Sequence, residues 1–312
     1  MDVVSRKDIE AAASRINGRV RRTPVIQLEE AAFGIDAEIF LKLELFQHTG
    51  SFKPRGAFNR ILSADVPRAG VITASGGNHG QAVAYASKVL GVDAEIFVPE
   101  GSPSLKAERI RRYGAALTVT GQYYDDAMDA CRARAMETGA LLVHPYDHPD
   151  VVAGQGSVGR EMEDQLPDVD AILVAVGGGG LAAGVAAWYQ SERKVVTVEP
   201  ESCTTLASAL AAGQPVDVSV GGIASDALGA RKIGEIPFSI ARKHVAEAVL
   251  VSDEAILEAR QRLWESLRIV AEPGGVASLA ALLSAAYVPD RGERVGVIIC
   301  GGNTASLPDP LP

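Results

Sequence analysis

The chain has 312 residues, of which 47% are hydrophobic and 22% charged, so it can bury a large core and is long enough for two domains. Its formal net charge is -9 at pH 7 with the acidic residues spread along the sequence, which argues against nucleic acid or an anionic membrane as a partner. The sequence contains no run of about 18 apolar residues and no signal-peptide core, so it predicts neither a membrane span nor a targeting segment.

The predicted elements alternate between short strands and longer helices. After Ser5, apolar residues at helical spacing predict a helix over residues 5–16, with Asp8 completing an approximate capping box. Strands are predicted at 38–44, 70–74, 94–99, 115–120, 171–176, 194–200 and 295–300. Helices are predicted at 79–90, 103–113, 122–138, 181–191, 253–268 and 275–286. This alternation is typical of an α/β protein with parallel sheets.

Three cysteines, Cys131, Cys203 and Cys300, have no paired spacing and cannot all form disulfides within one chain. This usage is typical of a reducing compartment, so we expect the protein in the cytoplasm. Cys131 and Cys203 are expected to be small buried side chains. The basic stretch at 108–114 is expected to form one solvated helix face.

The first segment that could carry chemistry is TGSFKPRG at 49–56, which places Lys53 at the start of a predicted helix. A lysine amine forms a Schiff base readily only when burial or nearby positive potential favours its neutral form. A helix N-terminus beside Phe52 supplies both conditions. Lys53 is therefore a candidate for covalent cofactor attachment, although one lysine in isolation also fits an ordinary surface charge.

The second segment, SGGNHGQA at 75–82, lies between a predicted strand and a predicted helix, where free backbone amides favour a carboxylate. Asn78 in this segment has two interpretations, a cofactor ligand or an ordinary helix N-cap. His79 is assigned only to the binding loop, because a helix histidine with a satisfied ring is the commoner case.

The third segment, VGGGGLAAG at 176–184, follows a strand and opens a helix, at the edge where open parallel sheets bind ligands. The backbone can approach a phosphate closely at its four consecutive glycines, Gly177, Gly178, Gly179 and Gly180. A dinucleotide site is the competing interpretation, because Glu199 lies about 20 residues further on, where a ribose-binding acid would stand. The spacing departs from G-x-G-x-x-G, and Lys53 with the asparagine loop favours a carbonyl cofactor instead.

The fourth segment, CGGN at 300–303, follows the last predicted strand, so Cys300 should point into the same cleft. Its other interpretation is a small buried apolar residue. Together the four segments resemble the signature set of the fold-type II pyridoxal-phosphate enzymes, specifically the branch of serine/threonine dehydratases and serine racemases. The resemblance runs from RRTPV at 21–25 to CGGN.

The resemblance implies two open parallel-sheet domains of the kind found in the tryptophan synthase β-subunit. A large domain would comprise residues 1–66 and 148–312, and a small domain would be inserted at 67–147. The loop HPYDHPD at 144–150, rich in turn-forming residues, lies near this boundary. The resemblance also implies pyridoxal 5'-phosphate as the cofactor and a homodimer as the assembly.

The family pattern assigns roles to matching residues. Lys53 would bind the cofactor and move the Cα proton, Asn78 would bond the ring hydroxyl, and Cys300 would bond the pyridine nitrogen. The remaining cofactor contacts would come from Phe52, Gly177, Gly178, Gly179, Gly180 and Leu181. The amino-acid substrate would be held by Ser75, Gly77, Asn78, His79 and Glu272. Glu272 lies in AEPGGVAS at 271–278, and its other interpretation is a first-turn acid favoured by the helix dipole.

The implied activity is β-elimination, the dehydration and deamination of L-threonine and/or L-serine to a 2-oxoacid and ammonia. Racemases of the family carry a serine two residues before the asparagine, whereas this chain has Gly76, which favours elimination. Relatives often carry aspartate at the position of Ser225, so another β-hydroxy amino acid, such as 3-hydroxyaspartate or phenylserine, is an alternative substrate. A racemase is a further alternative, and a nicotinamide-dependent oxidoreductase is a distant one. A catalytically silent binder is disfavoured because the four segments are intact.

No metal site is predicted. Several relatives bind a divalent cation beside the glycine loop through a glutamate and an aspartate six residues later. Here Glu199 fits the first position, but the second is Thr205, and hard cations prefer carboxylate and carbonyl oxygens. His144, Asp147 and His148 lie in the proline-rich loop and are expected to be turn residues.

Overall fold

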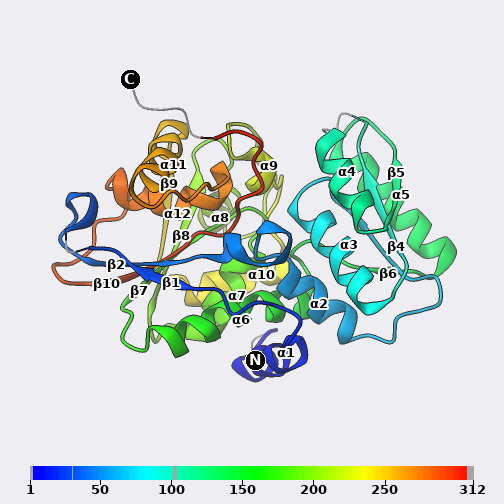
Figure 1. The fold of residues 1–312 in the computed structure, drawn as a ribbon, viewed down its shortest axis with the longest axis horizontal. Helices are drawn as coiled ribbons and strands as arrows, with labels where there is room; N and C mark the ends of the chain where they lie inside the picture. Colours follow the sequence, from blue (N-terminus) through cyan, green and yellow to red (C-terminus); the bar gives the residue numbers. More distant parts are fainter. Residues whose placement is uncertain (1–2, 30, 101–103, 308–312) are drawn as a thin grey trace.

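The computed structural model describes residues 3–29, 31–100 and 104–307, and within these ranges the strands form two separate sheets (Figure 1). The strands are β1 (Val25–Gln27), β2 (Glu38–Lys42), β3 (Val71–Ala74), β4 (Ala94–Val98), β5 (Ala116–Val119), β6 (Leu141–Leu142), β7 (Ala171–Ala175), β8 (Lys194–Pro200), β9 (Glu247–Val251) and β10 (Arg294–Ile298). The helices are α1 (Arg6–Ile16), α2 (Pro54–Leu62), α3 (Asn78–Leu90), α4 (Ser104–Arg112), α5 (Tyr124–Thr138), α6 (Pro149–Gln165), α7 (Gly180–Tyr189), α8 (Thr205–Ala212), α9 (Ser225–Leu228), α10 (Glu235–His244), α11 (Asp253–Leu267) and α12 (Pro273–Leu283). None of the helices in these ranges has the length and apolar content needed to cross a membrane.

Every predicted strand is present, with bounds that differ by at most two residues. The predicted helices are present as well, although residue 103, where one was expected to begin, lies outside the described residues. The sequence analysis missed β1, β6 and β9, and it missed α6, α8, α9 and α10. In α6 the prolines were interpreted only as turn signals, but Pro149 occupies the first helical turn, where a missing N–H costs nothing.

The larger sheet has the strand order β1-β2-β10-β7-β8-β9. Its neighbouring strands pair in parallel, except that β1 pairs antiparallel with β2 at the edge. The central strand β7, AILVA, is buried along its whole length, as expected for a parallel strand covered on both faces. Because β2, β10 and β7 are adjacent and parallel, the segments that follow them emerge at the same edge of the sheet.

Helices cover both faces of this sheet: α11 and α12 lie on one side, and α6 and α7 on the other (Figure 1). We call this sheet and its helices the large lobe. The core between the layers is made mainly of alanine, valine, leucine and isoleucine side chains from β7, β8, β10, α7 and α12.

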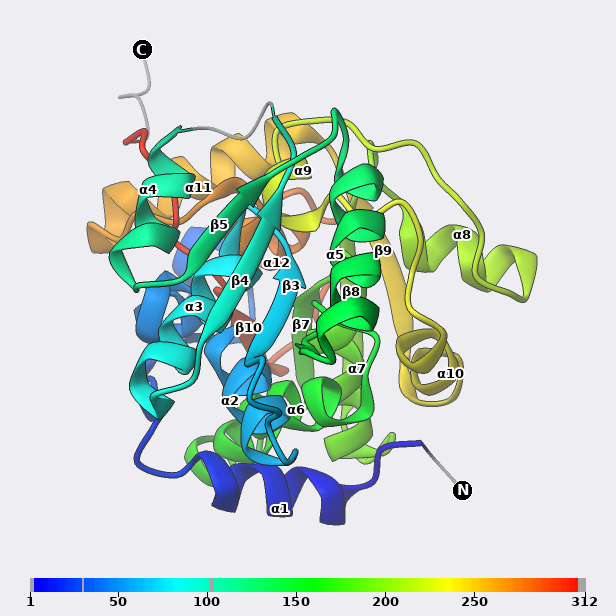
Figure 2. The same ribbon diagram turned by 90° about the vertical axis from the view of Figure 1, so that its right-hand side faces the viewer.

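The smaller sheet has the order β5-β4-β3-β6, with all pairings parallel. Alternate residues of β3 pack on opposite faces: Val71 joins a core with α3 and α4, whereas Ile72 and Ala74 join a core with α5. Cys131 on α5 is buried in the second core, as expected. We call this sheet with α3, α4 and α5 the small lobe, which faces the viewer in Figure 2. The boundaries of the inserted domain at 67 and 147 stay a prediction.

A buried ion network joins β2, α2 and α6 in the large lobe. The Arg55 guanidinium donates from Nε to Glu44 Oε2 at 2.8 Å and from Nη2 to Glu44 Oε1 at 2.7 Å, and Nη2 lies 2.6 Å from Glu161 Oε2. Lys42 Nζ lies 3.1 Å from Glu161 Oε1. Burial alone would raise the pKa of Glu44, but the Arg55 guanidinium outweighs it and holds that pKa below its ordinary value. Two cations therefore meet two carboxylates in a buried network, in which the Glu161 side chain is the most exposed, at 11%.

We expect Arg55→Met to lower the free energy of unfolding by about 3–5 kcal/mol, because it leaves the buried Glu44 carboxylate without its guanidinium partner. Urea denaturation followed by circular dichroism measures this change. The matched control is Arg112→Met, which removes an exposed pair with Glu108 and should change the free energy by about 0.5 kcal/mol or less. Equal effects of the two substitutions would contradict the importance of the buried network.

Candidate active site

Main-chain hydrogen bonds hold the Lys53 segment against CGGN. Ser51 forms an antiparallel bridge with Gly301, the Phe52 N–H donates to the Cys300 carbonyl at 3.2 Å, and the Gly302 N–H donates to the Gly50 carbonyl at 2.9 Å. Lys53 is the N-cap of α2, with Pro54 in its first turn. The position of the Lys53 backbone is therefore fixed by the end of β10.

The Lys53 amine is partly buried and donates from Nζ to the Pro145 carbonyl at 3.0 Å. Nζ also lies 5.1 Å from the centroid of the Phe52 ring. Burial lowers the pKa of Lys53 to about 8, against the opposing effects of Cys300 and Glu272. Because burial raises the pKa of Cys300 to about 12, its thiol is neutral near pH 8. The negative charge that opposes the lowering of the Lys53 pKa therefore comes from Glu272.

Asn78 does not act as an N-cap, so that alternative interpretation is wrong. Helix α3 begins at Asn78, its N-cap is Gly77, and no side chain caps it. The Asn78 amide donates from Nδ2 to Glu272 Oε1 at 2.6 Å, and its Oδ1 accepts from Asn303 Nδ2 at 2.7 Å. Glu272 is 6% exposed and makes no side-chain cap on α12, so its carboxylate is directed at Asn78 instead of at the helix amides.

The sequence analysis missed the role of Asn303, although CGGN was recognised. Asn303 Nδ2 donates to both the Asn78 Oδ1 and the Thr49 carbonyl, and this fixes which end of the Asn78 amide is an acceptor. Arg109 Nη1 reaches Asn303 Oδ1 at 3.4 Å from the small lobe. The expectation that 108–114 is only a solvated face is thus wrong for Arg109.

The glycine loop joins β7 to α7 in a conformation that needs glycine. Gly179 is the N-cap of α7 with φ of 89°. A Cβ at Gly177 would lie 2.9 Å from the Leu228 backbone, and one at Gly178 would lie 2.2 Å from the Tyr146 ring. Leu181 follows as a buried residue. The first amides of α7, which have no partner inside the helix, are thus available to an anion.

Glu199 is not placed for a dinucleotide. Glu199 is 1% exposed. Its Oε1 accepts a hydrogen bond from the Leu206 N–H at 2.7 Å, and its Oε2 accepts one from the Ala207 N–H at 2.8 Å. Burial raises its pKa, whereas these hydrogen bonds lower it. A carboxylate engaged by the start of α8 cannot also bind a ribose.

Ser75, Gly77, Asn78 and His79 line one cavity together with Lys53 and Gly178, and the cavity measures about 760 Å³. His79 is 3% exposed, and its Nε2 bonds the Val143 carbonyl at 2.9 Å. Burial, with Lys53 as a further cause, lowers the pKa of His79 to about 3, so its ring is neutral. Within the described residues its Nδ1 is a buried atom with no hydrogen-bond partner. The His79 ring is therefore neutral, with Nδ1 as its free acceptor atom, and cannot act as a cation.

Cys300 is buried, with Sγ 3.5 Å from the Gly274 carbonyl, so its thiol is a protonated donor. Cys203 is also buried, and its Sγ lies 3.4 Å from the Leu228 and Ala230 carbonyls. Cys203 therefore has the structural place that we expected.

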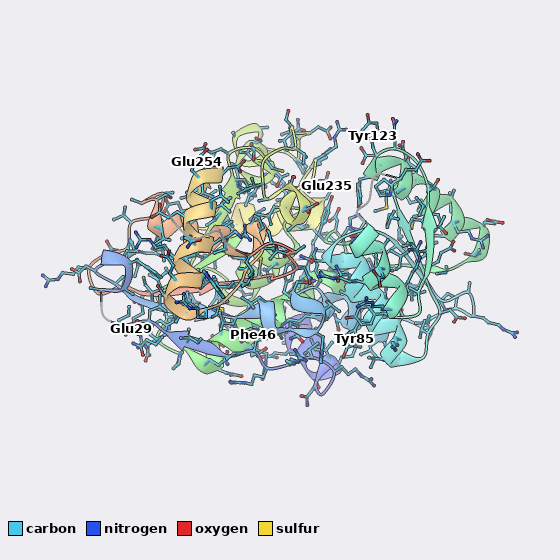
Figure 3. All side chains as sticks on the ribbon, turned by 45° about the horizontal axis from the view of Figure 1, so that its top comes forward. Glu29, Phe46, Tyr85, Tyr123, Glu235 and Glu254 are labelled. Atoms are coloured by element: carbon cyan, nitrogen blue, oxygen red, sulfur yellow. The ribbon has the colours of Figure 1, made fainter. Side chains whose placement is uncertain are left out.

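Both lobes contribute to the outer part of the cavity. Tyr123 and Tyr124 line it from the small lobe, and Arg231 and Lys232 line it from the large lobe. Figure 3 labels Tyr123 and, on the facing part of the large lobe, Glu235. An ion pair of 3.5 Å between Arg231 and Asp125 crosses between the lobes.

Pro145 and Tyr146 of the loop at 144–148 line the cavity, whereas the sequence predicted only a domain boundary and turn residues here. The Tyr146 ring lies against Gly178, and the Asp147 carboxylate accepts from the Glu235 and Ile236 amides at the start of α10. His144 Nδ1 accepts from the Asp147 N–H, and His148 Nδ1 accepts from the Asp150 N–H, as expected of turn residues. The signal that could have revealed Tyr146 is an aromatic residue inside a turn.

The fold and the site are those of an α/β enzyme whose cavity is lined by a lysine of lowered pKa and by a residue of the glycine loop. The family described as "Pyridoxal-phosphate dependent enzyme" matches residues 16–301. The L-threonine ammonia-lyase of Thermotoga maritima is 37% identical over 306 residues, which cover 96% of this chain and 76% of that protein. The L-threo-3-hydroxyaspartate ammonia-lyase of Saccharomyces cerevisiae is 36% identical over 302 residues, which cover 95% of this chain and 92% of that protein. Among solved structures, maize serine racemase matches with a TM-score of 0.92 at 32% identity, covering 97% of this chain and 94% of that chain.

The chain therefore belongs to the fold-type II pyridoxal-phosphate dependent enzymes, and its cofactor is pyridoxal 5'-phosphate. The residues fit this group. Lys53 would provide an amine for the aldehyde, and the start of α7 would provide amides for the phosphate. Glycine at positions 177 and 178 lets Leu228 and Tyr146 pack directly against this loop.

We expect the rate of pyridoxal phosphate uptake by the cofactor-free protein to rise with pH through about 8, because the neutral Lys53 amine is the reacting form. Glu272→Gln removes the charge that raises the pKa of Lys53, so the midpoint should move to lower pH. Visible absorbance recorded after mixing measures the rate. The matched control Glu258→Gln changes an exposed residue of α11 and should leave the midpoint in place. A midpoint near 10.5, the ordinary value, would contradict the role of burial.

Proposed function

We propose that this protein is an ammonia-lyase that dehydrates and deaminates L-threonine and/or L-serine to the 2-oxoacid and ammonia. The observation that carries the proposal is one cavity that holds both the Lys53 amine, with a pKa near 8, and the helix-start loop from Ser75 to His79. The Lys53 amine can move a proton, and the loop from Ser75 to His79 suits a substrate carboxylate. The similarity to the L-threonine ammonia-lyase of Thermotoga maritima supports the choice of substrate.

The chain's own residues divide the work of binding the cofactor. The amides at the start of α7, after Gly179, would hold the phosphate. Asn78, fixed between Glu272 and Asn303, would meet the ring hydroxyl. The neutral Cys300 thiol would donate to the ring nitrogen without protonating it fully.

When bound, pyridoxal phosphate makes the Cα proton of an attached amino acid acidic by withdrawing electrons. Neutral Lys53 would remove that proton, since its lowered pKa lies close to the working pH. The amides that follow Gly77 at the start of α3 would fix the substrate carboxylate and so orient the Cα–H bond toward Lys53. With the proton that Lys53 took from Cα, the β-hydroxyl would leave as water, and hydrolysis of the released enamine would then consume one water and free ammonia.

A second candidate is dehydration of 3-hydroxyaspartate. Arg231 and Lys232 line the outer cavity and could meet a second carboxylate, although Asp125 and Asp226 lie there too. The yeast L-threo-3-hydroxyaspartate ammonia-lyase supports this candidate. Racemisation is disfavoured because Gly76, which lines the cavity, has no proton to give.

We also propose that the protein acts as a homodimer in the cytoplasm. The family resemblance supports the dimer. The three free and buried cysteines suit a reducing compartment.

Visible absorbance from 300 to 500 nm before and after L-threonine, with 2-oxobutanoate assayed in the same sample, tests the activity. We expect a cofactor band in the wild type that changes on addition of L-threonine while 2-oxobutanoate forms. Lys53→Ala should lack the native band and form product at least 1,000-fold more slowly, because it loses both attachment and proton transfer. Lys232→Ala is the matched control and should keep the band. A band without product from L-threonine or L-serine, but with product from 3-hydroxyaspartate, would replace the first candidate by the second.

A further inference from the structure

Thr205 connects the glycine loop to a buried carboxylate. It is the first residue of α8 and is 0% exposed. Its Oγ1 lies 2.6 Å from the Gly177 carbonyl oxygen and 2.9 Å from Glu199 Oε1. Gly177 is the first glycine after β7, and Glu199 lies in β8, the strand beside β7. One hydroxyl therefore touches both the loop and the neighbouring strand.

The Glu199 end of this connection is rigid. The carboxylate accepts from the Leu206 and Ala207 amides, so it is held by the N-terminal turn of α8. The turn, the carboxylate and the Thr205 hydroxyl form one unit that also contacts the Gly177 carbonyl, and the single hydrogen of the hydroxyl is shared between its two acceptors. Because the Thr205 hydroxyl holds the Gly177 carbonyl, it limits the directions in which the following amides of the glycine loop can point.

These residues do not fit the divalent cation that the family resemblance implies beside this loop. The set offers one carboxylate, and both of its oxygens already accept backbone N–H bonds. Magnesium or manganese would need further oxygen ligands, but the second acidic position is the neutral Thr205. The hydroxyl also occupies the side of the Gly177 carbonyl that faces Glu199.

We propose that the Thr205 hydroxyl positions the glycine loop by linking Gly177 to Glu199, in the place that a divalent cation takes in relatives. The enzyme then binds pyridoxal phosphate without any divalent cation. This inference rests on the family's cofactor and is independent of the proposed substrate. Thr205 is a positioning residue, since it acts on the cofactor through the loop.

The test is the affinity of the cofactor-free protein for pyridoxal phosphate, measured by absorbance titration in EDTA and again in Mn²⁺. The wild type should give the same affinity in both. Thr205→Val keeps the shape but leaves the Gly177 carbonyl without its donor, so its affinity should fall about tenfold or more. Thr205→Ser restores a hydroxyl and should recover most of the affinity.

Thr204→Val is the matched control, because the Thr204 hydroxyl contacts only the Ser208 hydroxyl among the contacts described for its side chain. It should bind the cofactor within about twofold of the wild type. Thr205→Val with the affinity of Thr204→Val would overturn the positioning role.

Thr205→Asp supplies the missing second carboxylate and tests the relation to the cation. We expect this variant to take up Mn²⁺ in a calorimetric titration and to bind pyridoxal phosphate well only in Mn²⁺. A wild type that loses affinity in EDTA and regains it with Mn²⁺ would overturn the inference, and so would a Thr205→Asp variant that binds no Mn²⁺.

Discussion

The buried pairing of Arg55 with Glu44 and Glu161 is the constraint on which the site depends most. It ties the first turn of α2 to the segment after β2 and to α6. Lys53 precedes Arg55 by two residues, so the network also fixes the backbone position from which the Lys53 side chain extends. The cost of burying four charged groups is offset only while all partners are present, which makes this arrangement specific as well as stable.

The fold converts four distant segments into one site through the order of its strands. The Lys53 segment, CGGN and the glycine loop come after β2, β10 and β7, which are neighbours in the larger sheet. The small lobe contributes Asn78 at the start of α3, the helix that follows β3, and Glu272 with Asn303 meets it from the large lobe. The Lys53 amine donates to the Pro145 carbonyl, so the segment that leaves the small lobe also contacts this lysine.

The sequence predicted the features of the fold that depend on local patterns of residues. Alternation of apolar runs predicted the α/β class and every strand that has a strong β-branched core, and the glycines after β7 were correctly placed at the start of a helix, whereas their role in binding an anion stays a prediction. It did not predict β9 or α10, whose local signals are weak, nor α6, whose start was hidden by prolines. Contacts between residues far apart, such as Asn78 with Glu272 and Asn303, depend on the tertiary fold, so no spacing rule could give them. The same limit applies to the link between Thr205 and Gly177.

Chemical identification of the attachment residue tests the central claim most directly. The holoprotein is reduced with borohydride, digested and mapped by mass spectrometry. The account predicts the phosphopyridoxyl group on Lys53, because this lysine combines a lowered pKa with the cavity. The group on Lys232, which lines the same cavity, or on no lysine at all would contradict it.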